Sequence, residues 1–179
     1  METIELAFNL QRQWLESSLQ AVHSTTGQAI LQNLMRRIMQ DLIQISKADE
    51  GSIFLVDDMG RVIEGVLARG QVQEKYRQLL IGEVLDKGFA GWVLEHRTFG
   101  LIEDTRHDSR WWHLPDQPYT VLSALGVPLL FSDMALGVLT LMHHQAGHFS
   151  QKDVHLVQLL HDQMALLIEN ARLHALHQK

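Results

Sequence analysis

The chain has 179 residues, of which 46% are hydrophobic and 20% charged, and its formal net charge is −6. This composition predicts a folded domain, and the acidic balance lacks the basic footprint of a nucleic-acid-binding protein. No apolar run approaches the roughly 20 residues of a membrane helix, and the N-terminus has no signal-peptide pattern. We therefore expect a cytoplasmic protein without nucleic-acid or membrane partners.

Cysteine is absent from the sequence. Its absence excludes disulfides, thiolate metal sites, thiol catalysis and a chromophore attached through sulfur. The sequence also contains no GxSxG, phosphate-loop or HExxH motif, so no catalytic constellation is apparent and we do not expect an enzyme.

Two helices are predicted at the N-terminal end. Residues 2–22 are amphipathic, and a break at 23–28 precedes a second helix with apolar residues at intervals of four, which Thr25 or Thr26 can cap. The first helix carries three apolar residues that are seven apart, namely Phe8, Leu15 and Val22. This spacing is typical of a seam for a partner helix, and the alternative is a stripe packed on the chain's own domain.

Short elements follow, separated by turn residues. They are, in order, a hairpin over 52–68, a strand over 80–85, a helix over 89–97, a strand within 98–104, a loop over 104–120 and a hairpin over 121–144. The strands are apolar on both sides, so helices should cover both faces of the sheet. We expect an α+β fold with an antiparallel sheet of five or six strands, and Pro128 near an edge or a bulge.

The closing helix has more apolar surface than one sheet can cover. Ser150 and Asp153 resemble a capping box at its start. Its heptad-spaced leucines are Leu159, Leu166 and Leu173. Each buried leucine contributes ~1.5–3 kcal/mol, so we expect these residues and the seam of the first helix to form a homodimer interface. The alternative is that the first helix of the same chain covers them.

Five stretches in this order resemble the GAF domain family. They are ADEGSIFLVDD, GFAGWVLEHR, DTRHDSRW, SALGVPLLFSDMALGVLTL and HFSQKDVHLVQLLHDQMALLIENARL. The resemblance implies a GAF-like fold with long N- and C-terminal helices. It divides the chain into an N-terminal helix at 1–24, the domain at 25–175 and the start of a linker helix at 176–179.

Function is also implied by the resemblance. It indicates a non-catalytic sensory or regulatory domain of a bacterial signalling protein, attached to an output such as a two-component histidine kinase or a nucleotide or diguanylate cyclase. The alternatives are a structural dimerisation spacer with a closed pocket and a sensor of haem or of a non-covalently bound chromophore.

A small-molecule pocket between the sheet and the short helices is implied as well. The candidate contacts are Trp92, Asp104, Arg110, Trp111, Trp112, Tyr119 and Ser123. The aromatic rings can stack on a planar ligand, and Asp104 and Arg110 can fix its polar edge. The alternatives are that Trp111 and Trp112 fill the space as a lid, that Asp104 caps the following turn, and that Arg110 pairs with Asp108 or Asp104.

The cofactor stays unknown at this stage. Family members that bind cyclic nucleotides carry an Asn-Lys pair followed by Phe and Asp-Glu. Here Phe149 and Asp153 match, whereas His143-His144 and Val154 depart, which argues against cyclic-nucleotide binding. The lack of cysteine excludes a covalently bound bilin and the methionine sulfoxide reductase activity of some members.

Eleven histidines raise the question of a metal. Successive residues of a strand point to opposite faces, so His143 and His144 are not expected to share an ion. Surface or partly buried histidines are the expectation, and no metal site is predicted.

Overall fold

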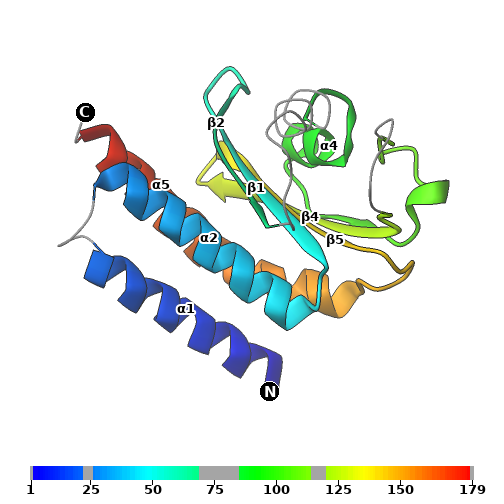
Figure 1. Ribbon diagram of the computed structural model, residues 1–179, viewed down its shortest axis with the longest axis horizontal. Coiled ribbons are helices and arrows are strands. Elements are labelled where there is room, and N and C mark those ends of the chain that lie inside the picture. The colour runs from blue at the N-terminus through cyan, green and yellow to red at the C-terminus, as the bar shows by residue number, and fades with distance from the viewer. Residues whose placement is uncertain (1, 22–25, 69–84, 114–119, 178–179) are drawn as a thin grey trace.

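The computed structural model describes residues 2–21, 26–68, 85–113 and 120–177. The helices and strands follow one another largely in the predicted order (Figure 1). In chain order the elements are α1 (Glu2–Ala21), α2 (Gly27–Ser46), β1 (Glu50–Val56), β2 (Val62–Ala68), α4 (Phe89–His96), β3 (Gly100–Ile102), the 3₁₀ turn η1 (Thr105–His107), β4 (Ser123–Phe131), β5 (Met134–His143) and α5 (Gln151–His177).

The strands of the described residues form one antiparallel sheet of five, in the order β2-β1-β5-β4-β3. This confirms the α+β class. Strand β3 pairs with β4 only between Ala124 and Gly126, so Pro128 lies where no described strand pairs with β4 on its β3 side. A register shift follows at Leu129 and Leu130. Pro128 therefore lies beside a free edge and a bulge, as expected.

Helices cover both faces of the sheet, also as predicted (Figure 1). Helices α2 and α5 pack on one face, and α4 lies on the other. Helix α1 packs against α2 and α5 and forms an outer layer. The larger hydrophobic core lies between the three long helices and the sheet, and a smaller one lies under α4.

Helix α2 shows why its sequence folds this way. Its apolar residues recur every three or four positions and face the core, namely Ile30, Leu34, Met35, Ile38, Met39 and Leu42, all at most 6% exposed. Thr26 occupies the predicted N-cap position, but its side chain makes no capping hydrogen bond. One half of the predicted capping box before α5 is present, because the carboxylate of Asp153 accepts a hydrogen bond of 2.8 Å from the backbone amide of Ser150. The hydroxyl of Ser150 donates to the same carboxylate, also at 2.8 Å.

Helix α1 packs on the rest of the chain with a face other than the predicted seam. Ala7, Leu10 and Trp14 are buried, whereas Phe8 is 64% and Leu15 45% exposed. The alternative in which the seam packs on its own domain is thus wrong for these two residues. Val22 lies outside the described residues.

Helix α5 buries most of its apolar residues but not the heptad-spaced leucines. The residues facing the core include Leu156, Val157, Leu160, Met164, Leu167 and Ile168. The heptad-spaced set stays at the surface, with Leu159 partly buried, Leu166 39% exposed and Leu173 41% exposed. Helix α1 covers part of the apolar surface that α5 turns away from the sheet, and Leu166 and Leu173 stay partly exposed to solvent.

Two further expectations concern segments that the structure describes only in part. The short strand expected over 80–85 lies outside the described residues except for Leu85, which is helical. The loop over 104–120 is described up to residue 113 and contains η1. No described helix has both the length and the apolar composition that crossing a bilayer requires.

Candidate functional site

Arg110 contacts several elements on the α4 side of the sheet. Its guanidinium lies 4.7 Å from the ring centre of Trp92 and 5.5 Å from that of Phe89, in the range of cation–π contacts. It also donates to both carboxylate oxygens of Asp108 and, at 2.8 Å, to the carbonyl of Leu101. These bonds raise the pKa of Arg110 and lower that of Asp108. Arg110 therefore ties its loop to β3 and α4, and the predicted pairing with Asp108 is confirmed.

Asp104 has a local role in the structure. Its carboxylate accepts a hydrogen bond of 3.0 Å from the backbone of Arg106 and two from the guanidinium of the same residue. The Arg106 side chain holds the pKa of Asp104 well below its usual range. The alternative that Asp104 caps the turn after it is therefore confirmed.

The other predicted ligand contacts are dispersed. Trp92 and Trp111 pack against the smaller core, beside Arg110. Trp112 is 40% exposed and lies under the ammonium of Lys87 at 5.4 Å. Ser123 is fully buried and donates 2.8 Å to the carbonyl of Gln145. Tyr119 lies outside the described residues, so the structure brings together Trp92, Arg110 and Trp111, and their contact with a ligand stays a prediction.

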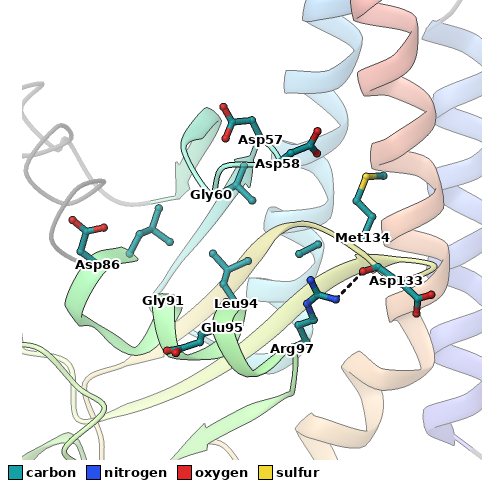
Figure 2. Close-up of a pocket in the computed structure, with 13 residues that line it drawn as sticks. Asp57, Asp58, Gly60, Asp86, Gly91, Leu94, Glu95, Arg97, Asp133 and Met134 are labelled. Carbon is teal, nitrogen blue, oxygen red and sulfur yellow. Dashed lines mark hydrogen bonds between the residues drawn. The ribbon is translucent and has the colours of Figure 1, made fainter.

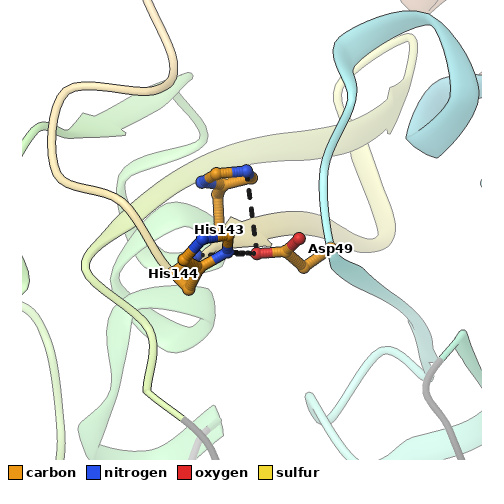
Figure 3. Close-up of side chains that lie close together, drawn as sticks. All are labelled: Asp49, His143 and His144. Atoms are coloured by element: carbon orange, nitrogen blue, oxygen red, sulfur yellow. Dashed lines mark hydrogen bonds and ion pairs between the residues drawn. The ribbon is translucent and has the colours of Figure 1, made fainter.

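An open pocket of about 260 Å³ lies at the end of the sheet where β1 begins and β5 ends. It is lined by Asp49, Glu50, Thr120, Val121, Met142, His143 and His144. Val121 and Met142 belong to the smaller core, so the apolar wall of this pocket is on the α4 side. The polar wall is the cluster of Asp49, His143 and His144 shown in Figure 3.

This cluster corrects the prediction about the two histidines. The Nδ1 of His144 lies 2.5 Å and the Nε2 of His143 3.7 Å from the same Oδ2 of Asp49. The two imidazole rings stack, with centroids 4.5 Å apart. They do not point to opposite faces, because β5 ends at His143 and the alternation of a strand no longer applies to His144.

Neighbouring groups set the charge of the cluster. The ring of His148 stacks on that of His143 at 3.5 Å. Burial, and then the charges of His148 and His144, lower the pKa of His143. Burial raises the pKa of Asp49, but hydrogen bonds from His144 outweigh it and lower that pKa overall. The cluster thus combines an ionised carboxylate with a neutral imidazole that is only 7% exposed.

A second open pocket, of about 590 Å³, lies at the opposite end of the sheet (Figure 2). The β1–β2 turn, the end of α4 and the β4–β5 turn contribute its walls. Its carboxylates are those of Asp57, Asp58, Asp86, Glu95 and Asp133. Asp57 pairs with Arg61, so part of this negative charge is already engaged within the protein. Arg97 donates 2.9 Å to the backbone carbonyl of Asp133.

Neither pocket is lined by the residues that we predicted from the sequence as ligand contacts. Asp49 was overlooked because it precedes a strand in a segment that only marks the end of α2. The only sequence signal for this site is the pair of histidines at the end of β5. Asp49 lies beside them because Glu50 pairs with Met142 in the sheet. The sequence does not give that register.

The arrangement defines a class of small α+β domains with helices on both sides of an antiparallel sheet. The sequence matches the model of the GAF domain family over residues 28–169, so the chain belongs to the GAF domain family. This is a sensory and regulatory fold of signalling proteins. A search of curated proteins gives no match.

Solved structures agree with this fold. The chain is similar to the GAF domain of a phosphoenolpyruvate-protein phosphotransferase from Coxiella burnetii, with 21% identity, a TM-score of 0.70 and coverage of 95% of this chain and 96% of that one. The corresponding domain from Acinetobacter has 20% identity and a TM-score of 0.67, with 93% and 95% covered. Free methionine-R-sulfoxide reductase from Neisseria meningitidis has 13% identity and a TM-score of 0.62, with 96% and 92% covered. At such identities the likeness shows the fold alone.

Proposed function

We propose that this GAF domain is a non-catalytic regulatory module that binds a small molecule and dimerises through α1 and α5 to control an attached signalling output. One observation carries the dimerisation in this proposal, which is the apolar surface that the folded chain leaves uncovered on these two helices. Besides Phe8, Leu15, Leu166 and Leu173, it includes Ile4 and Leu19, which are 63% and 62% exposed.

The two helices are placed to share an interface. They lie on the same side of the sheet (Figure 1). The side-chain amide of Gln11 donates 2.8 Å to the carbonyl of Leu159, so the middle of α1 lies against the first half of α5. A single exposed leucine is ordinary on a protein surface, but several on adjacent helices are typical of a binding surface. A second copy presents the same surface and can cover it symmetrically.

Helix α5 supports a link between the sheet and the output. It packs against β4 and runs from Gln151 to His177. A ligand on the α4 side of the sheet that changes the packing of β4 and β5 thereby acts on α5. Packed interfaces have discrete arrangements, so a small displacement of α5 relative to its twin is sufficient to favour one of them.

Sedimentation of the full chain tests the dimer. We expect a dimer at tens of micromolar and a monomer for Leu166→Glu combined with Leu173→Glu, with an unchanged circular dichroism spectrum. Met59→Glu is the matched control, because Met59 is 77% exposed in the β1–β2 turn. A wild-type chain that stays monomeric at high micromolar concentration would contradict the proposal.

Ligand binding is tested separately by thermal shift against nucleotides and metabolites, and haem or a bound chromophore by visible absorbance. A ligand at a hundred times its dissociation constant adds about 2.7 kcal/mol to the free energy of unfolding, which is readily measured. A dimer without any ligand response would favour the structural spacer over the sensor.

A further inference from the structure

We propose that Asp49, His143 and His144 form a binding site for a divalent transition-metal ion of the zinc type. The site goes beyond the regulatory function proposed above, and it is independent of the dimer. The three side chains offer one carboxylate oxygen and two imidazole nitrogens, and these atoms lie within 4.8 Å of one another. Figure 3 shows that they converge from the start of β1 and the end of β5.

The spacing of the donor atoms is close to what such an ion needs. Zinc lies ~2.0–2.2 Å from nitrogen and oxygen ligands, so tetrahedral ligand atoms are separated by about 3.4 Å. The Nε2 of His143 and the Oδ2 of Asp49 are 3.7 Å apart. The Nδ1 of His144 is 2.5 Å from that oxygen, which is a hydrogen-bond distance and must lengthen. Both side chains involved in the change are partly exposed, so they can rotate outward by the required ångström.

The backbone holds the two strand ends together without help from a metal. The amide of Asp49 donates 3.0 Å to the carbonyl of Met142, and the amide of His144 donates 2.8 Å to the carboxylate of Asp49. On the other side, the amide of Leu122 donates 2.9 Å to the carbonyl of His143. The sheet itself thus sets the backbone positions of the ligands, and binding requires changes only in their side chains and in the hydrogen bonds that these side chains make.

The donor set selects the type of ion. Two imidazoles and one carboxylate suit zinc, nickel, cobalt or copper, whereas magnesium and calcium prefer oxygen ligands. The burial of His143 favours its neutral form, which is the form that binds a metal. Its Nδ1 accepts a 3.0 Å hydrogen bond from the amide of Gln145, so the ring proton is on Nε2 without a metal. Binding through Nε2 moves this proton to Nδ1, so the hydrogen bond from the amide of Gln145 must be given up.

Three protein ligands leave one position of a tetrahedral ion open. The pocket of about 260 Å³ is lined by the same three residues and continues to the apolar side chains of Val121 and Met142. An ion here therefore faces a space that a water molecule or a small anionic ligand can enter. The ion gives the pocket a positive charge, whereas the carboxylate of Asp49 alone gives it a negative one.

Titration of the full, tag-free chain with zinc chloride by calorimetry tests the site, with cobalt absorbance as the second readout. We expect one ion per chain with micromolar or tighter affinity, and cobalt bands of the intensity that tetrahedral coordination produces. His144→Ala and Asp49→Asn should each weaken binding at least tenfold. Both side chains are partly exposed, so these variants should fold, and His143→Gln provides a third removal of a ligand.

Each ligand substitution has a control that removes the same type of side chain outside the site. His155→Ala removes an exposed histidine of α5, and Asp86→Asn removes a carboxylate of the acidic pocket in Figure 2. Both should bind zinc like the wild type, and millimolar magnesium should not compete. The proposal is overturned if the wild type binds no zinc at 100 micromolar free ion, or if the affinity is unchanged in His144→Ala and Asp49→Asn. Loss of binding in Asp86→Asn alone would place the ion in the other pocket and equally refute it.

Discussion

The indole N–H of Trp14 donates a 2.7 Å hydrogen bond to the carboxylate of Asp41 and thereby joins α1 to α2. Trp14 is fully buried, and the same carboxylate pairs with Arg37 at 2.8 Å. Helix α1 is therefore an integral layer of the domain. Its exposed apolar residues are held in a fixed position on the surface, where they are available to a partner.

Replacing Trp14 should detach this layer. We expect Trp14→Ala to lower the free energy of unfolding by about 3–5 kcal/mol, because it removes a large buried side chain. Trp14→Phe should cost less, since most of the apolar contact is kept and Asp41 retains Arg37. Urea unfolding at low micromolar concentration gives both values. Equal losses in the two variants would show that the hydrogen bond, and not the packing, holds α1.

Gly27 at the start of α2 marks a close approach to α5. A Cβ atom there would lie 2.5 Å from the Cα and 2.8 Å from the backbone nitrogen of Ala175. Alanine favours a helix by up to ~1 kcal/mol over glycine, whereas overpacking costs ~1–3 kcal/mol. The contact is with backbone and cannot be relieved by a rotamer change, so the second effect should prevail.

Gly27→Ala should therefore destabilise the domain and displace the end of α5. Thermal unfolding measures the first effect, and hydrogen exchange at residues 171–177 measures the second. Asn33→Ala, at an exposed position of the same helix, is the control and should be neutral or slightly stabilising, because alanine is the better helix former. A stabilised Gly27→Ala variant would mean that the two helices separate at little cost.

The fold was largely predictable because its periodicities are local. The four-residue spacing of Ile30, Leu34 and Ile38 specifies which face of α2 is buried, and the turn after Val56 defines the first hairpin. Helix α1 was harder, because it has apolar residues on two faces. The sequence emphasised the heptad of Phe8 and Leu15, whereas the face that packs within the chain is the one with Trp14. Which face meets the domain depends on the surface of α2 and α5, and that is a tertiary property.

The pairing of Asp108 with Arg110 predicts a pH dependence in the acid range. The bond from Arg110 lowers the pKa of Asp108 below its ordinary value of 3.8. A carboxyl whose pKa is lowered in the folded state stabilises that state above the unfolded pKa, and this contribution is lost as the pH falls through the folded pKa. The wild type should therefore be more stable than Asp108→Asn at pH 7, and the difference should shrink below about pH 4.

Unfolding of the two proteins between pH 7 and pH 2.5 measures this difference. Asp86→Asn is a suitable control, because Asp86 is exposed and should give no comparable gap at neutral pH. A gap between the wild type and Asp108→Asn that persists at the lowest pH would mean that the ionised carboxylate is not its source.

The site was less predictable than the fold because its parts are distant in the chain. Asp49 and His144 are 95 positions apart, and no local pattern connects them. Most of the residues chosen from the sequence were aromatic or charged residues in a long loop, a sound criterion for function. Several of them have a structural role that also requires such residues, as Asp104 at the start of η1 shows.

Arg110 allows these two roles to be separated by experiment. It is 26% exposed in its side chain, contacts Trp92 and holds the carbonyl of Leu101. Arg110→Ala should lower the free energy of unfolding by about 1–3 kcal/mol without any ligand, because the partly buried carbonyl of Leu101 and the carboxylate of Asp108 lose their partner. Arg110→Lys should recover less than half, since one ammonium cannot replace a planar guanidinium that bonds and stacks together. Thermal unfolding of the ligand-free chain decides the matter: unchanged stability in both variants would return Arg110 to the ligand-binding role that the sequence suggested.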